Sequence, residues 1–196
     1  MALGLFAQIG LIAHLFSLLV PALGGPAAGI LMGLATASAI VGRTLVGWLM
    51  PPGSERRLVA CASLVAQIAG SVALIMAAGT DVTLLVAGVL LFGAGIGNTT
   101  SLPPLIAQVE FAKADVQRVV PLIVAIGQGA YAFAPAAFGA LRALSAAEAT
   151  LVFVAAAMVQ VLAIAAFLAG RRDRPSSTSL DTGSRPTDPS PSRSSN

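Results

Sequence analysis

The chain has 196 residues, of which 57% are hydrophobic and only 10% are charged, and its mean hydropathy is +0.90. A soluble globular domain carries about 25% charged residues, so this composition excludes a soluble enzyme and indicates a protein of the lipid bilayer. The 11 basic and 8 acidic residues give a net charge of +3, but the basic residues are dispersed among connections. That distribution is typical of topology signals and predicts no nucleic-acid partner.

Six apolar runs follow one another along the chain, over residues 1–20, 26–50, 58–79, 82–100, 119–141 and 149–170. A helix needs about 20 apolar residues to cross the hydrocarbon core. Lipid accepts only helices or closed barrels, because every backbone polar group must find a partner inside the protein. Since the runs are continuous and do not alternate, they favour helices. We therefore predict an all-α polytopic membrane protein with a six-helix transmembrane domain over residues 1–170.

Turn-forming and charged residues separate the runs. The longest connection, residues 110–118, carries acid–base pairs three residues apart, which predicts a short amphipathic helix at the membrane interface. From residue 171 onward the composition changes to Ser, Pro, Thr, Asp and Arg. This change predicts a disordered cytoplasmic tail over residues 171–196.

The basic residues are divided unevenly between the two sides of the membrane. Six helices place both termini on one side, and Arg142 is the one basic residue in the opposite connections. Because cytoplasmic connections are enriched in Lys and Arg, both termini are predicted to be cytoplasmic. The basic residues on that side are Arg56, Arg57, Lys113, Arg118, Arg171, Arg172 and Arg174.

The apolar runs contain no Asp or Glu. The chain therefore supplies no buried carboxylate for proton coupling and no carboxylate pair for hydrolysis. It also lacks the Gly-Lys-Ser/Thr phosphate loop of ATP-driven motors. The lone cysteine, Cys61, permits neither a disulfide nor a cysteine cluster, and its apolar setting indicates packing. We expect no enzymatic activity, no cofactor and no metal site.

The first run carries Gln8 and His14, the single histidine of the chain. His14 is predicted either to hydrogen-bond to a neighbouring helix as a neutral imidazole or to accept a proton or bind an anion. Because Gln8 and His14 are six residues apart, they point in different directions and form no cluster of their own.

Arg43 and Asn98 lie towards the ends of the second and fourth runs. The Arg43 guanidinium is predicted to reach the headgroups or an acidic partner, with direct substrate contact as the alternative. Asn98 closes a glycine-rich helix and is followed by Thr99, Thr100 and Ser101. Its amide is expected either to cap helix carbonyls or to line a polar pathway.

The fifth run places Pro121 and Pro135 around a Gly-Gln-Gly centre at 127–129. Such a helix can bend and expose carbonyls, which is typical of binding sites in carriers. Gln128 and Tyr131 are three residues apart and share a face, so this face is a candidate either for substrate contact or for interhelical packing. The remaining amides, Gln67 and Gln160, are expected to form single interhelical hydrogen bonds.

Residues 1 to about 170 resemble the C-terminal half of the major facilitator superfamily. The resemblance lies in the stretch 42–57, the Gly-Gln-Gly…Pro fifth run and the six spans. The stretch is similar to the superfamily signature Gly-x-Leu-Ala-Asp-Arg-x-Gly-Arg-Arg, in which Gly47, Leu49, Arg56 and Arg57 match. Pro51 stands at the position of the signature's acid.

The resemblance implies a secondary carrier that moves a small molecule by alternating access, with each six-helix half built from two inverted three-helix repeats. It implies that the first and fourth helices line the pathway, the second and fifth flank it, and the third and sixth face lipid. The pathway candidates are then Gln8, His14, Asn98, Gln128 and Tyr131, with Gln67 and Gln160 peripheral. The structural or gating candidates are Arg43, Gly47, Arg56 and Arg57.

A complete carrier of this type has about twelve helices. The chain is therefore expected to pair with a second six-helix half or to form a homodimer, in a bilayer such as the bacterial inner membrane. Protons are a possible coupling ion. The alternative interpretation is a membrane scaffold without transport activity, or a truncated remnant of a carrier.

Overall fold

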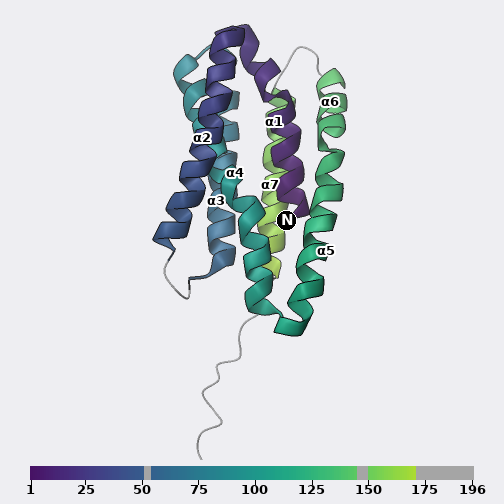
Figure 1. Cartoon of the computed structure of the whole chain (residues 1–196). Coiled ribbons are helices and arrows are strands. Elements are labelled where there is room, and N and C mark those ends of the chain that lie inside the picture. Colours follow the sequence, from purple (N-terminus) through teal and green to yellow (C-terminus); the bar gives the residue numbers. More distant parts are fainter. Residues whose placement is uncertain (51–53, 145–149, 171–196) are drawn as a thin grey trace, which may run out of the picture.

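The computed structural model describes residues 1–50, 54–144 and 150–170. These residues form seven α-helices (Figure 1). In chain order they are α1 (Ala2–Leu23), α2 (Gly25–Leu49), α3 (Arg56–Met76), α4 (Val82–Glu110), α5 (Lys113–Ala132), α6 (Ala134–Leu144) and α7 (Thr150–Ala169). The predicted tail at 171–196 lies outside the described residues.

Six helical segments are long and apolar enough to cross a membrane, with α5 and α6 together forming one of them, Lys113–Leu144. For the described residues, the predictions of an all-α fold and of six helical segments with the length and apolarity of membrane spans are confirmed. The bend between α5 and α6 falls at Phe133, directly before Ala134 and Pro135. Proline lacks an N–H, so it is tolerated in the first turn of α6 but cannot continue the hydrogen bonds of α5.

The connection between α4 and α5 differs from the prediction. No separate interface helix forms over residues 110–118, because α4 continues to Glu110 and α5 already begins at Lys113. The fourth span therefore does not end near residue 100, and Pro103 and Pro104 lie inside α4. Neighbouring helices and polar side chains compensate for freed carbonyls in a membrane helix, so such prolines need not end it.

Local sequence explains where the helices stop on the opposite side. Gly24 separates α1 from α2 with φ 76°, a left-handed conformation that glycine adopts without strain, and Pro26 follows in the first turn of α2. Beyond the end of α3, Gly79 has φ 71°. The Asp81 carboxylate then accepts a hydrogen bond from the Leu84 N–H at 3.1 Å and caps α4.

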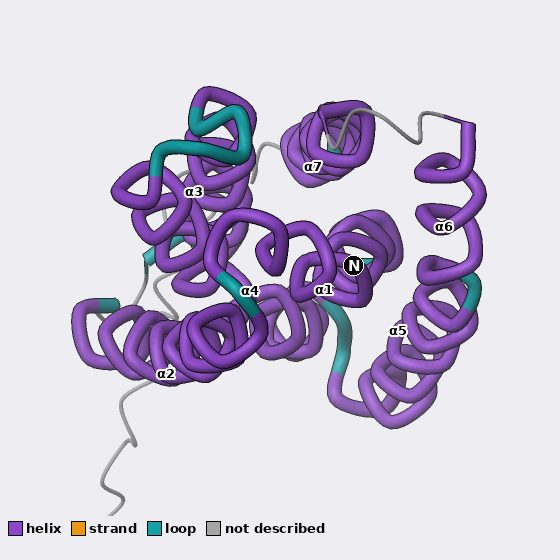
Figure 2. The backbone as a smooth tube through the Cα atoms, turned by 90° about the horizontal axis from the view of Figure 1, so that it is seen from above, coloured by secondary structure: helices purple, strands orange, loops and turns teal. Residues whose placement is uncertain are grey.

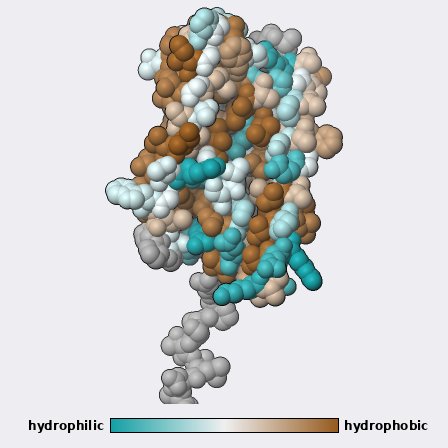
Figure 3. Space-filling view, in the orientation of Figure 1, coloured by the Kyte–Doolittle hydropathy of each residue, from teal (hydrophilic) through white to brown (hydrophobic). Residues whose placement is uncertain are grey.

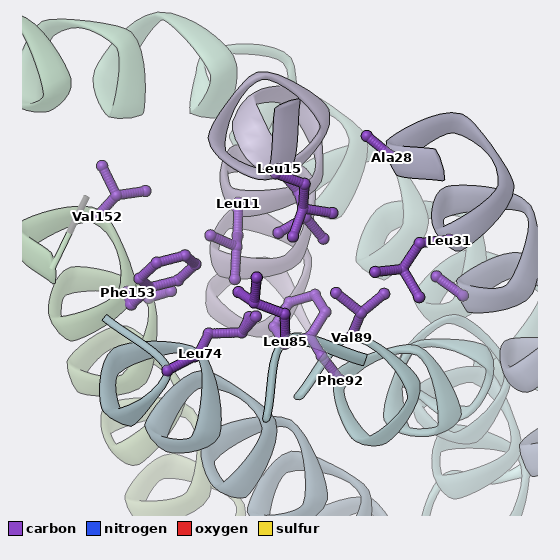
Figure 4. Packing of buried hydrophobic residues seen from close by; sticks show 14 of the residues in the cluster. Leu11, Leu15, Ala28, Leu31, Leu74, Leu85, Val89, Phe92, Val152 and Phe153 are labelled. Carbon is purple, nitrogen blue, oxygen red and sulfur yellow. The ribbon is translucent and has the colours of Figure 1, made fainter. Parts of the chain in front are cut away.

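Helices α1 and α4 occupy the middle of the bundle. In the view along the bundle, α4 lies between α2 and α3, and α1 lies between α5 and α7 (Figure 2). Side chains of α1, α3, α4 and α7 point toward one another in the core, as Figure 4 shows for Leu11, Leu74, Leu85, Phe92 and Phe153. In lipid, such a core is stabilised mainly by close packing, because the surroundings are equally apolar.

Glycines on two sides of α4 bring its backbone close to both neighbours. A Cβ on Gly93 would lie 2.6 Å from the Ala35 carbonyl oxygen of α2. A Cβ on Gly88 would lie 2.9 Å from the Gly70 carbonyl oxygen of α3. Gly97 continues the row toward α2, and Gly95 continues the row toward α3. The sequence pattern of small residues in α4 thus corresponds to two separate helix–helix contacts.

The outside of the bundle is largely apolar. Large hydrophobic side chains are exposed along the helices, including Trp48, Ile30 and Phe133. Figure 3 shows hydrophobic residues over much of one face, with hydrophilic residues concentrated toward the lower end. Exposed apolar surface on this scale is unsuited to water and suits an integral membrane protein.

Candidate functional site

Four uncharged polar side chains form a hydrogen-bonded chain inside the bundle. Gln8 Nε2 donates to Thr99 Oγ1 at 2.6 Å, and Gln67 Nε2 approaches the same oxygen at 3.4 Å. Gln160 Nε2 donates to Gln67 Oε1 at 2.9 Å. The four side chains are at most 5% exposed. We call them the polar chain; it connects α1, α4, α3 and α7.

The polar chain revises the expectation for two residues. The predicted single interhelical hydrogen bond is confirmed for Gln160, whereas Gln67 makes two. The peripheral position that the resemblance implies is wrong for both, because both are 0% exposed. The inner faces of α3 and α7 pack against each other, and this contact buries the two amides. The member that sequence reasoning missed is Thr99, whose signal was the run of polar residues after Asn98.

The polar chain ends on an unused acceptor. Gln160 Oε1 is buried without a hydrogen-bond partner among the described residues, and so is Ser71 Oγ, one helical turn after Gln67 on α3. Buried polar atoms normally have partners. The inner part of the bundle can therefore accept further hydrogen bonds.

His14 joins α1 to the bend between α5 and α6. Its Nε2 lies 2.9 Å from the Pro135 carbonyl oxygen. Because a carbonyl only accepts, His14 must donate from Nε2. One turn away, Arg142 of α6 donates to Ser17 Oγ, and Ser17 Oγ donates to the His14 carbonyl oxygen at 2.7 Å. As predicted, His14 and Gln8 contact different groups.

Arg43 connects α2 to α4 through groups that the sequence did not single out. Its Nε donates to the Gly97 carbonyl oxygen at 2.7 Å, and its Nη2 donates to Thr100 Oγ1 at 2.9 Å. The close approach depends on Gly97, since a Cβ there would lie 2.9 Å from the Arg43 Cβ. Neither of these two partners is acidic. Asn98, the neighbour of Gly97, is 4% exposed.

The two arginines of the signature-like stretch bind carbonyls of other helices. Arg56 Nη1 donates to the Leu105 carbonyl oxygen of α4 at 2.7 Å, and Arg57 Nη1 donates to the Phe167 carbonyl oxygen of α7 at 2.9 Å. Phe167 lies in the last turn of α7, where carbonyls have no partner within the helix and a cation complements the helix dipole. A Cβ on Gly47 would have nothing within 4 Å of it, and Pro51 lies outside the described residues.

Arg57→Met is expected to lower the stability of the bundle by about 1–2 kcal/mol. The methionine retains apolar bulk but leaves the Phe167 carbonyl oxygen without its charged donor. Hydrogen exchange should accelerate in the last turn of α7. The control is Arg118→Met on α5, whose side chain is exposed. Equal exchange in the two variants would contradict a capping role for Arg57.

The remaining candidates lie on the outside of the bundle. Gln128 is exposed and Tyr131 is partly exposed, whereas Gly127, which faces α1, is buried. A Cβ on Gly129 would have open space around it. Interhelical packing within the described bundle therefore does not account for Gln128, and its amide is available to a partner or a ligand.

The chain matches no family model, no curated protein and no solved structure. Among the described residues, no group of three or more His, Cys, Asp or Glu side chains could hold a metal ion. The function is therefore inferred from the packing of the helices and the placement of the polar side chains.

Proposed function

We propose that the chain is a six-helix half of a secondary carrier of the major facilitator type. Together with a second six-helix half, it transports a small molecule across the bacterial inner membrane by alternating access. The second half is another chain or a second copy of this chain. Both termini are cytoplasmic in this proposal. The observation that supports it most is the exchange of helices between the first three spans and the last three.

The exchange is visible in which helices pack together. Helix α1 packs mainly against α5, α6 and α7, which belong to the last three spans, and α4 packs mainly against α2 and α3, which belong to the first three. The third helices of the two sets, α3 and α7, pack against each other. This reciprocal pattern is what two inverted three-helix repeats produce around a pseudo-two-fold axis.

The least buried helices supply the face for a second half. In α2 and in the α5–α6 segment, only 11% of an 18-residue apolar stretch is buried. The corresponding share is 44% in α1 and 50% in α4. The α5–α6 segment also exposes Gln128. An amide facing hydrocarbon has an energetic cost, so polar residues in membrane helices face a protein partner or a water-filled cavity.

Thiol labelling tests the aqueous cavity. In a Cys61→Ala background, single cysteines replace Gln128, His14 and Asn98, and Leu162→Cys on the exposed side of α7 is the control. A membrane-impermeant thiol reagent is expected to react at 128 and 14, more slowly at the buried position 98, and not at 162. If position 128 is as unreactive as 162, the scaffold or remnant interpretation is favoured.

A further inference from the structure

An apolar groove lies between α5 and α7, on the far side of α1 from the polar chain. Its volume is about 220 Å³, and no polar surface lines it. The lining residues are Ala2, Leu3 and Phe6 of α1, Ala130 of α5 and Val159 of α7. At roughly 30 Å³ for each water-sized group, the groove has room for about seven methylene groups.

The groove follows from the helix packing. Helix α1 packs against both α5 and α7, but α5 and α7 hardly contact each other, so α1 forms the floor between them (Figure 2). Small side chains at Ala2 and Ala130 leave the space unfilled. Water is a poor occupant because a buried water needs two to four polar partners, and the lining offers none.

We propose that the groove binds one acyl chain of an anionic phospholipid. The groove lies at a depth that such a chain reaches from the end of the bundle formed by the C-terminus of α7 and the N-terminus of α5. Val159 is ten residues before Ala169, the last residue of α7, and Ala130 is twelve residues after Arg118. At 1.5 Å per residue these separations are about 15 and 18 Å, which is half of a hydrocarbon core roughly 30 Å thick.

The charge at this end favours an anionic headgroup. Lys113 and Arg118 are exposed on the first turns of α5, and Arg57 lies at the end of α7. The acidic residues described at this end are Glu55, Glu110 and Asp115, and the basic residues Arg56, Arg57, Lys113 and Arg118 exceed them by one. Hydrocarbon gains little by moving from the bilayer into an apolar groove, so selectivity must come from the headgroup. A basic residue near the membrane surface contributes about fivefold in affinity for anionic lipid.

Lipid retention tests the proposal without reference to transport. The full chain is reconstituted in equal phosphatidylglycerol and phosphatidylcholine, repurified in mild detergent, and its bound lipid is counted by mass spectrometry. Wild type is expected to retain about one phosphatidylglycerol per chain. Ala130→Trp, which fills the groove, should reduce this at least fivefold. Ala125→Trp is the matched control, because Ala125 is exposed on α5 about 140° from Ala130.

The remaining outcomes decide the occupant. Lys113→Gln with Arg118→Gln should lower the preference for phosphatidylglycerol about tenfold or more. The proposal is overturned if Ala130→Trp retains as much phosphatidylglycerol as wild type, or if Ala125→Trp loses as much as Ala130→Trp. It is also overturned if wild type retains phosphatidylglycerol and phosphatidylcholine equally. If Ala130→Trp does not fold, it is replaced by Ala130→Leu and by the Lys113→Gln, Arg118→Gln variant. Loss of bound phosphatidylglycerol in these variants supports the groove site, and unchanged retention overturns it.

Discussion

Gly95→Ala is expected to destabilise the folded bundle by about 1–3 kcal/mol. A Cβ at this position would overlap the Ser63 carbonyl oxygen and would lie 2.5 Å from Gln67 Cγ. The overlap with backbone can be relieved only if α3 moves away from α4, and that movement also weakens the polar chain at Gln67. Equilibrium unfolding of the isolated chain in mixed detergent micelles measures the change.

The control is Gly33→Ala on α2, because a Cβ on Gly33 has nothing within 4 Å. Alanine is the better helix former by about 1 kcal/mol, so this variant should be neutral or slightly more stable. If the two variants are equally stable, α3 and α4 do not approach each other closely enough at Gly95 to require a glycine.

Gln67→Leu is expected to cost about 1–2 kcal/mol, because it leaves the Gln160 Nε2 group buried without its acceptor. Removing both partners is less costly than removing one. The double variant Gln67→Leu, Gln160→Leu should therefore recover most of the lost stability. Thr99 remains bonded to Gln8 in both variants.

A double-mutant cycle with the single Gln160→Leu variant measures the coupling. Hydrogen bonds between membrane helices average about 0.6 kcal/mol in such cycles, so a coupling of that size or above is expected. If the double variant is as unstable as the sum of the two single ones, the amides do not interact as described.

The membrane-spanning helices could be predicted from the sequence because each depends on its own length and composition. The end of α4 could not be predicted, because whether Pro103 and Pro104 end the helix depends on the helices packed around them. The two prolines remove the N–H groups that would bond to the Thr99 and Thr100 carbonyls, and α4 nevertheless continues to Glu110. The proposed bend in the fifth span does occur, at Phe133 before Pro135, whereas Pro121 stays within α5.

The polar residues inside the spans could be found in the sequence, but not their partners. Whether Gln8 of α1 meets Thr99 of α4 depends on how far the two helices are rotated and shifted against each other. Small residues determine that register through backbone contacts between packed helices, as at Gly70 of α3 and Gly88 of α4. The resemblance implies a peripheral Gln67, whereas the face of α3 that carries it is covered by α4 and α7.

The two glycine rows of α4 have different repeats. Gly93 and Gly97, facing α2, are four residues apart, whereas Gly88 and Gly95, facing α3, are seven apart. If α4 slid along its axis by four residues, a glycine would again lie opposite α2, but larger side chains would lie against α3. If it slid by seven residues, a glycine would again lie opposite α3, but larger side chains would lie against α2. Because no small displacement suits both neighbours, α4 has a single axial position in which Thr99 is level with Gln8 and Gln67.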